Sequence, residues 1–314
     1  MEVVSVKRSE LRAAERKKKR RKWIYIPLII IGTFIIAVLA WGVLIYNDAK
    51  KTVNERMYTE VESINKEVSK KKIKEKEHLN ILMLGIDAAT GQRGRSDTII
   101  VLNLRPDENK MKMISIPRDT RTLIAGKGFD DKINHAYAFG GEDMAVATVE
   151  NFLGIEIDYH VAMNMQGLKE LIDVLGGITV VNDIEWKDSR YHFTKGQLAL
   201  DGEKALAYVR MRKQDPKGDF GRAKRQRQVI ESIISKGASI ATVSNISNTI
   251  DILGNNMTTS LDFSDMKRLL TGYSSTRNNV EQYQVQGSGK MINGIYYYIV
   301  SEEEVRKVHD MIVN

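Results

Sequence analysis

Apolar runs and amphipathic stretches alternate along the chain from about residue 79 onward. Asn80–Ile86 (NILMLGI) is a continuous apolar run, and Thr98–Leu104 (TIIVLNL) and Met111–Ile116 (MKMISI) follow it. All three are predicted strands, and the first and third are apolar enough to be covered on both faces. These strands indicate a sheet with helices packed against it.

Segments with helical spacing separate further strands. Glu142–Phe152 and Gln166–Leu175 are predicted helices, and Gly221–Ile240 is a predicted helix that is basic first and apolar later. The segments predicted as strands are Asp158–Met163, Ile178–Val181 and a short strand within Ala205–Arg212, and the remainder to Asn314 is predicted as helix, strand and terminal helix. Strands alternating with helices predict an α/β fold, layered as α/β/α around a central mixed sheet.

The segment before this domain is different. Trp23–Tyr46 contains no charged residue. As a helix it would reach about 36 Å, enough to cross a bilayer core of about 30 Å. A cleaved signal peptide would be shorter and would be followed by a small-residue cleavage site. The pattern therefore predicts an uncleaved transmembrane helix, and residues 47–78 are predicted to be a partly helical polar stalk leading to a domain over residues 79–314.

The net charge of +8 resides mainly in the N-terminal tail. Residues 1–22 contain ten Lys or Arg and three Glu, which gives +7. Basic residues stay on the cytoplasmic side of a membrane anchor, so the tail is predicted inside and the domain outside. The rest of the chain is nearly neutral, which argues against a basic nucleic-acid-binding domain.

Several chemistries are excluded by composition or spacing. The chain has no cysteine, so disulfides, thiolate metal sites and cysteine nucleophiles are absent. Gly287–Lys290 (GSGK) lacks the other residues of a P-loop. His135 and His160 are interpreted as structural, and Ile295–Ile299 (IYYYI) is interpreted as a packed strand and not as a base-stacking platform.

Charged residues gather where the predicted strands begin or end. Asp87 follows the first strand, Arg95 and Asp97 precede or open the second, and Arg118 and Arg121 follow the third. Ligands of open α/β sheets bind at the carboxyl ends of strands. Asp87 and Arg118 are therefore expected to meet if their strands run parallel.

A second charged group lies between residues 208 and 226. In a strand over Tyr208–Arg212, Arg210 and Arg212 would point to one face. A following helix that begins near Asp219 would direct its positive dipole end toward the same place. One face of that helix would present three polar side chains at i, i+3 and i+4: Arg222, Arg225 and Gln226.

Many arginines beside a few aspartates suit a pyrophosphate. Guanidinium groups bind phosphate oxygens in bidentate fashion, and two carboxylates together with phosphates can hold Mg²⁺. Taken singly, each of these residues is more often a solvated side chain or a structural ion pair. Several of these residues share strand ends or one helix face, which favours a common anion site. From the pattern alone, an anion site and separate structural roles both remain possible interpretations.

Six segments of the chain form an ordered set of motifs: NILMLGID (80–87), GRSDTIIVL (94–102), ISIPRDT (114–120), DVLGGI (173–178), LDGEKALAYVRMR (200–212) and DFGRAKRQRQ (219–228). In these segments and their order the sequence resembles the LytR–CpsA–Psr proteins of bacterial cell walls, and within them the LytR-type teichoic acid transferases. The resemblance covers residues 79–235 and, in layout, the N-terminal anchor.

The resemblance implies a function and a set of partners. It implies a membrane-anchored phosphotransferase, of a Gram-positive type, that moves an anionic glycopolymer such as wall teichoic acid from a polyprenyl-pyrophosphate carrier to peptidoglycan with Mg²⁺. A lipid-pyrophosphate hydrolase and a non-enzymatic regulator of the cell envelope remain as alternatives.

The resemblance also implies roles for individual residues. Asp87 and Asp97 would be the carboxylates on the metal side. Asp219 would orient the arginines or assist as a base, and Arg118, Asp219 and Arg121 would be the catalytic residues. The expected contacts to phosphate and pyrophosphate are Arg95, Arg118, Arg121, Arg210, Arg212, Arg222 and Gln226.

Overall fold

The computed structural model describes residues 39–88, 94–237 and 246–314. The chain divides into two compact units, Met1–Ala49 and Lys50–Asn314. Residues 39–52 are helical, and Leu39, Trp41 and Leu44 are exposed. Among the described residues, no helix has the length and apolarity to cross a membrane. Residues 23–38 of the predicted transmembrane segment lie outside the described residues, so that segment stays a prediction.

The second unit begins earlier than the domain boundary predicted at residue 79. The segment predicted as a stalk contains a π-helix, Val53–Met57 (η1), and helix α2, Lys66–Glu75. Val61 packs into one side of the core and Ile73 into the other. Residues 50–78 therefore contribute to the folded unit instead of only connecting to it.

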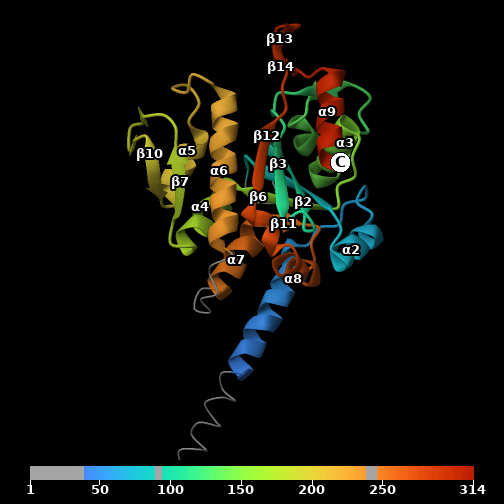
Figure 1. The fold of residues 1–314 in the computed structure, drawn as a ribbon, viewed down its shortest axis with the longest axis vertical. Helices are drawn as coiled ribbons and strands as arrows, with labels where there is room; N and C mark the ends of the chain where they lie inside the picture. The colour runs from blue at the N-terminus through green and yellow to red at the C-terminus, as the bar shows by residue number, and fades with distance from the viewer. Residues whose placement is uncertain (1–38, 89–93, 238–245) are drawn as a thin grey trace, which may run out of the picture. The chain divides into compact units, whose positions relative to one another are not determined.

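A six-stranded mixed sheet forms the centre of this unit (Figure 1). In spatial order the strands are β11 (Met257–Thr259), β6 (Tyr159–Asn164), β1 (Leu79–Ile86), β2 (Ser96–Arg105), β3 (Lys110–Ser115) and β12 (Val280–Gln284). Strand β2 is antiparallel to both of its neighbours, β1 and β3, so β1 and β3 run parallel to each other. Strand β6 is parallel to β1, and β12 is parallel to β3.

Helices cover both faces of the sheet, as the apolar runs predicted. Helices α3 (His135–Leu153) and α9 (Glu302–Val313) bury side chains against one face. Helices α2, α8 (Phe263–Gly272) and α6 (Asp219–Gly237) bury side chains against the other. The α/β/α layering around a mixed sheet is therefore confirmed. Helix α3 is longer than the predicted helix because a kink at Gly140 and Gly141 joins it to an earlier turn.

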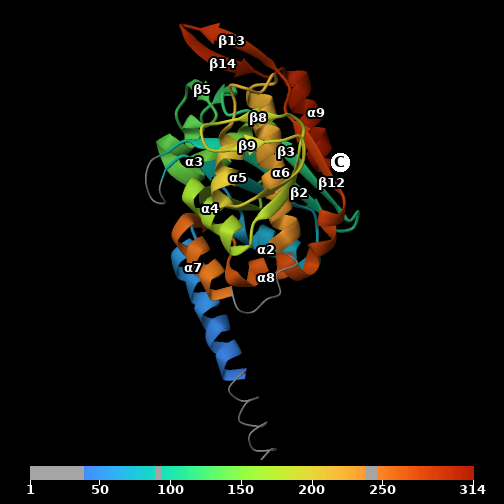
Figure 2. The same cartoon turned by 90° about the vertical axis from the view of Figure 1, so that its left-hand side faces the viewer.

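A second, smaller core lies on the outer side of α6 (Figures 1 and 2). It joins helices α4 (Met165–Val174) and α5 (Gly202–Arg210) to two small antiparallel pairs of strands. These pairs are β7 (Ile178–Asn182) with β10 (Gly196–Leu200), and β8 (Trp186–Lys187) with β9 (His192–Phe193). Strand β7 therefore does not extend the central sheet.

The strand predicted within Ala205–Arg212 is wrong, because residues 202–210 form helix α5. Asp201 caps this helix by accepting a hydrogen bond from the backbone N–H of Lys204 at 2.8 Å. Ala205, Tyr208 and Val209 are buried at helical spacing. The cap and the helical spacing outweigh the alternating pattern of Tyr-Val-Arg-Met-Arg. Arg210 and Arg212 consequently do not share the face of a strand.

The remaining elements flank the sheet. The β13–β14 hairpin extends past the end of the sheet beside α9 (Figure 2). The predicted strand over Ile295–Ile299 is confirmed as β14. These flanking elements are β4 (Arg121–Leu123), β5 (Asp130–Lys132), α7 (Ile246–Asn256), η3 (Ser274–Asn278), β13 (Ser288–Ile292) and β14 (Ile295–Ile299).

Arg225 holds the loop between α5 and α6 and does not face the expected anion site. Its guanidinium is buried, donates to the backbone carbonyls of Tyr208 and Met211, and pairs with Asp215 at 2.5 Å. Gly221 makes this arrangement possible, because a Cβ there would lie 1.8 Å from Oδ2 of Asp215. The expectation that Arg225 shares a binding face with Arg222 and Gln226 is therefore wrong.

Replacing Arg225 by Met should strongly destabilise the domain. The side chain of Asp215, which is 6% exposed, would lose its cationic partner. Breaking a buried ion pair in this way costs about 3–5 kcal/mol. Urea unfolding monitored by circular dichroism measures the loss. Lys224→Met on the same helix is the control, because its ion pair with Asp183 is half-exposed and should matter by less than about 1 kcal/mol.

Candidate active site

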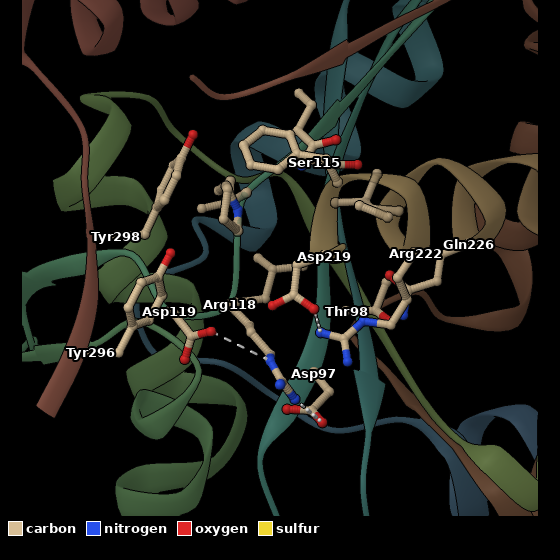
Figure 3. A pocket seen from close by; sticks show the side chains of 17 residues that line it. Asp97, Thr98, Ser115, Arg118, Asp119, Asp219, Arg222, Gln226, Tyr296 and Tyr298 are labelled. Atoms are coloured by element: carbon tan, nitrogen blue, oxygen red, sulfur yellow. Dashed lines mark hydrogen bonds and ion pairs between the residues drawn. The ribbon is translucent and has the colours of Figure 1, made fainter. Parts of the chain in front are cut away.

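The sheet topology brings the predicted charged segments to one edge. The C-terminal ends of the parallel strands β1, β3 and β12 lie at this edge, together with the N-terminal end of the antiparallel strand β2. The N-terminal end of α6 also lies here, and residues of β2, β3, β12 and α6 line a shared pocket (Figure 3). This is the position at which α/β sheets bind ligands.

Arg118 lies at the centre of the pocket (Figure 3). Its Nη1 donates to Oδ2 of Asp97 at 2.7 Å, and the side-chain amide of Asn134 donates to Oδ1 of the same carboxylate at 3.2 Å. Asp97 thus fixes the direction of the guanidinium. The side chains of Arg118 and Asp97 are each about one-fifth exposed, so charged groups are available at the pocket surface.

The first turns of α6 form the opposite wall. Asp219, the first residue of the helix, pairs through Oδ1 with Nε of Arg212 at 2.9 Å and with Nη2 of Arg222 at 3.1 Å. Asp219 therefore orients two arginines toward the positive end of the helix dipole. Burial lowers the pKa of Arg222 from its usual value, but an arginine remains charged at neutral pH. Gln226 lies one turn further along the same wall.

The other predicted residues lie around the pocket instead of lining it. Asp87 and Arg95 form an exposed ion pair at 3.7 Å where β1 ends and β2 begins. Arg121 pairs with Asp130 across the β4–β5 hairpin at 2.8 Å. Arg210 is exposed at the end of α5. The structure thus brings together Asp97, Arg118, Asp219, Arg222 and Gln226, with Arg212 held beside them by Asp219.

Among the pocket residues that the sequence prediction missed, three carry groups that could act on a ligand. Asp119 lies beside Arg118 and pairs with Lys132 at 2.7 Å. Tyr296 and Tyr298 come from the distant β14 strand and line the same pocket. Burial raises the pKa of Tyr298 to about 12, so it remains neutral. Asp119 could have been predicted, because it belongs to the segment ISIPRDT that also contains Arg118. No local pattern assigns the two tyrosines to this pocket.

An apolar cavity of about 130 Å³ adjoins the charged pocket. It lies between the sheet and helices α4, α5 and α6, and its wall includes Met83, Leu168 and Ile233. Thr98 and Gln226 line both spaces, so the two adjoin there. An apolar cavity that meets an arginine cluster suits a ligand with a hydrocarbon part and an anionic part.

The carboxylates at this edge have suitable chemistry for Mg²⁺. Mg²⁺ in proteins takes one or two carboxylates, and water and substrate phosphates complete its shell. The side chains of Asp87 and Asp97 are 53% and 19% exposed, and a carboxylate has about four lone-pair positions. The hydrogen bonds from Arg118 and Asn134 therefore do not use up the capacity of Asp97.

Comparisons with known proteins assign the family. The LytR_cpsA_psr family model matches residues 43–312, so the chain belongs to the LytR_cpsA_psr family. It is 40% identical over 294 residues to the polyisoprenyl-teichoic acid–peptidoglycan teichoic acid transferase TagU of Bacillus subtilis, covering 94% of this chain and 96% of that protein. This family membership confirms the resemblance deduced from the sequence segments.

Solved structures support the same assignment. The crystal structure of B. subtilis TagU matches with a TM-score of 0.63 and 42% identity, over 75% of this chain and 95% of that one. A structure of TagT bound to LI-WTA matches with a TM-score of 0.64 and 32% identity, over 76% of this chain and 90% of that one.

Proposed function

We propose that this protein transfers an anionic glycopolymer, of the wall teichoic acid class, from a polyprenyl-pyrophosphate carrier to peptidoglycan. The observation that carries the proposal is the arginine-lined pocket adjoining an apolar cavity. The pyrophosphate would lie among the arginines and the polyprenyl chain in the cavity. The names of TagU and of TagT bound to LI-WTA describe related proteins with this type of substrate.

Different residues of the pocket would have different roles in a phosphoryl-type transfer. Such reactions depend mainly on positioning and on stabilising charge on the phosphoryl oxygens. Arg118 would bind the phosphate that is attacked, and Arg222 with Gln226 would bind the phosphate that stays with the lipid. Asp219 would keep Arg212 and Arg222 in place through its two ion pairs. Arg95, Arg121 and Arg210 would contact more distal parts of the donor.

Asp87 and Asp97 would hold a divalent cation, most suitably Mg²⁺. When bound, it would neutralise charge on the pyrophosphate oxygens and make the leaving phosphate more stable. Removal of divalent cations with EDTA should therefore lower the transfer rate at least about a hundredfold. Titration with Mg²⁺ should restore the rate. Equal rates with and without EDTA would remove the metal from the proposal.

The membrane anchor predicted at Trp23–Tyr46 would place the domain on the outer face of the cell membrane. The lipid-linked donor is confined to the same surface, which raises its effective concentration at the site. The basic tail of residues 1–22 would remain in the cytoplasm.

The decisive experiment uses the full chain in phospholipid nanodiscs. A synthetic polyprenyl-pyrophosphate-linked disaccharide, Mg²⁺ and peptidoglycan oligomers are added, and the products are analysed by mass spectrometry. A sugar-phosphate adduct on peptidoglycan is the expected result. Sugar phosphate released into solution without an adduct would contradict transfer and identify a lipid-pyrophosphate hydrolase.

A further inference from the structure

The two ends of the charged pocket differ in chemistry. Thr98 and Gln226 lie at the end that adjoins the apolar cavity. Asp119 and Tyr296 lie on the other side of Arg118 (Figure 3). In an in-line displacement the attacking and leaving oxygens lie on opposite sides of the phosphorus atom. If the lipid phosphate leaves toward the apolar cavity, the attacking hydroxyl must enter beside Asp119.

The carboxylate of Asp119 and the guanidinium of Arg118 face each other without a hydrogen bond between them. Lys132 holds Oδ1 of Asp119 at 2.7 Å, while Oδ2 lies 3.7 Å from Nε of Arg118. That separation exceeds a normal N–H···O hydrogen bond of about 2.7–3.2 Å. Nε of Arg118 is buried and has no hydrogen-bond partner among the described residues. A hydroxyl in the pocket could donate to Oδ2 of Asp119, which accepts no hydrogen bond from Arg118.

The other residue at this end of the pocket is aromatic. Tyr296 lines the pocket and is 46% exposed. Its place depends on Gly289 of the neighbouring strand, because a Cβ at Gly289 would lie 2.7 Å from the ring. The next tyrosine, Tyr298, fixes the strand: its ring contacts Phe220 edge to face, and its N–H donates to the carbonyl of Asp119 at 2.8 Å. The hairpin and Asp119 are thus held together as one wall.

We propose that Asp119 and Tyr296 form the acceptor subsite, in which Tyr296 supports an acceptor sugar and Asp119 takes the proton of its attacking hydroxyl. This inference rests on the proposed function. The hydroxyl oxygen forms a bond to phosphorus as its proton moves to Oδ2 of Asp119. The bond from phosphorus to the bridging oxygen breaks, and its electron pair leaves on polyprenyl phosphate. Asp119 then returns the proton to water.

The role of Asp119 is tested by chemical rescue in full-length protein. Asp119→Ala should lower the rate of transfer about a hundredfold, as loss of a general base does. Donor binding should change less than about threefold, because the arginines remain. Added formate should raise the rate of this variant at least roughly fivefold by supplying a carboxylate.

Two variants make this test specific. Asp119→Asn keeps a hydrogen-bond partner for Lys132 and should show the same loss, which separates proton transfer from folding. Asp183→Ala removes a half-exposed carboxylate that also pairs with a lysine. This variant should transfer at the wild-type rate, and formate should not alter that rate. An Asp119→Asn variant as active as the wild type, or an Asp119→Ala variant that formate does not rescue, would overturn the assignment of Asp119.

The role of Tyr296 is tested by separating the kinetic constants. Tyr296→Ala should raise the KM for the peptidoglycan oligomer about five- to tenfold and leave the KM for the donor unchanged, because only contact with the acceptor is lost. Tyr296→Phe should behave as the wild type. Ile295→Ala is the matched control, because this side chain is 50% exposed and lies on the opposite face of the same strand.

The outcomes distinguish this inference from the proposed function. If the wild type forms no adduct with peptidoglycan, the proposed function fails and the acceptor subsite fails with it. If the wild type transfers but Tyr296→Ala retains its acceptor KM, the proposed function stands and the sugar platform is wrong.

Discussion

Arg118→Ala should reduce transfer about a thousandfold or more while the domain stays folded. Arg118 is the guanidinium at the centre of the pocket, held by Asp97 at 2.7 Å and facing Asp119 on its other side. Arginines that stabilise charge on a transferring phosphoryl group contribute about 10³–10⁵ in rate. The measurement is kcat/KM for adduct formation, with circular dichroism as the check on folding.

Two further variants define what the arginine does. Arg118→Lys keeps the positive charge but loses the planar fork, and should still lose about a hundredfold. Arg306→Ala, an exposed arginine on α9, should leave transfer unchanged. Transfer by Arg118→Ala within about threefold of the wild type would remove this residue from the reaction.

Ile233→Trp should separate long-chain from short-chain donors. Ile233 lines the apolar cavity on α6, and an indole there would take space that the polyprenyl chain needs. Excluding one five-carbon isoprene unit costs roughly 3–4 kcal/mol at about 0.8 kcal/mol per buried carbon, or a few hundredfold in kcat/KM. A donor with a single isoprene unit should lose less than about fivefold, because it does not need the blocked part.

The control for this variant is Leu270→Trp on α8, where the side chain is 72% exposed. Overpacking a core position costs about 1–3 kcal/mol of stability, so thermal unfolding of Ile233→Trp is measured beside the kinetics. A uniform loss for both donors with a lowered melting temperature would indicate a folding defect. Equal activity of Ile233→Trp and the wild type on the long donor would contradict the use of this cavity by the lipid.

The sequence predicted the fold well where burial dominates. The strands around Leu82, Val101 and Ile114 are mainly apolar segments, and their covered positions follow directly from that pattern. The strand predicted near Tyr208 was wrong because an alternating pattern of five residues is too short to outweigh a helix cap and helical burial. The local sequence alone does not distinguish a short strand from a capped helix at this place.

The site was predictable in part for a related reason. Asp97 and Asp219 lie at the N-terminal ends of β2 and α6, and Arg118 follows β3, so topology brings them to one edge. Arg225 lies one residue from Gln226 in sequence, yet its buried contacts direct it to the preceding loop. Tyr296 reaches the pocket only through the tertiary position of its hairpin. Sequence spacing can place a residue on a helix face. The packing of neighbouring segments decides whether that face lines the pocket or packs against another part of the chain.

The shared border at Thr98 and Gln226 has a consequence for the length of the polymer. Under the proposed function, the lipid end is enclosed by apolar side chains and the pyrophosphate by arginines, whereas sugars beyond the first lie outside both spaces. Selection would then depend on the linkage region alone. Chains of very different degrees of polymerisation would react at similar rates, and the length distribution found on the wall would be set by the polymerising enzymes upstream.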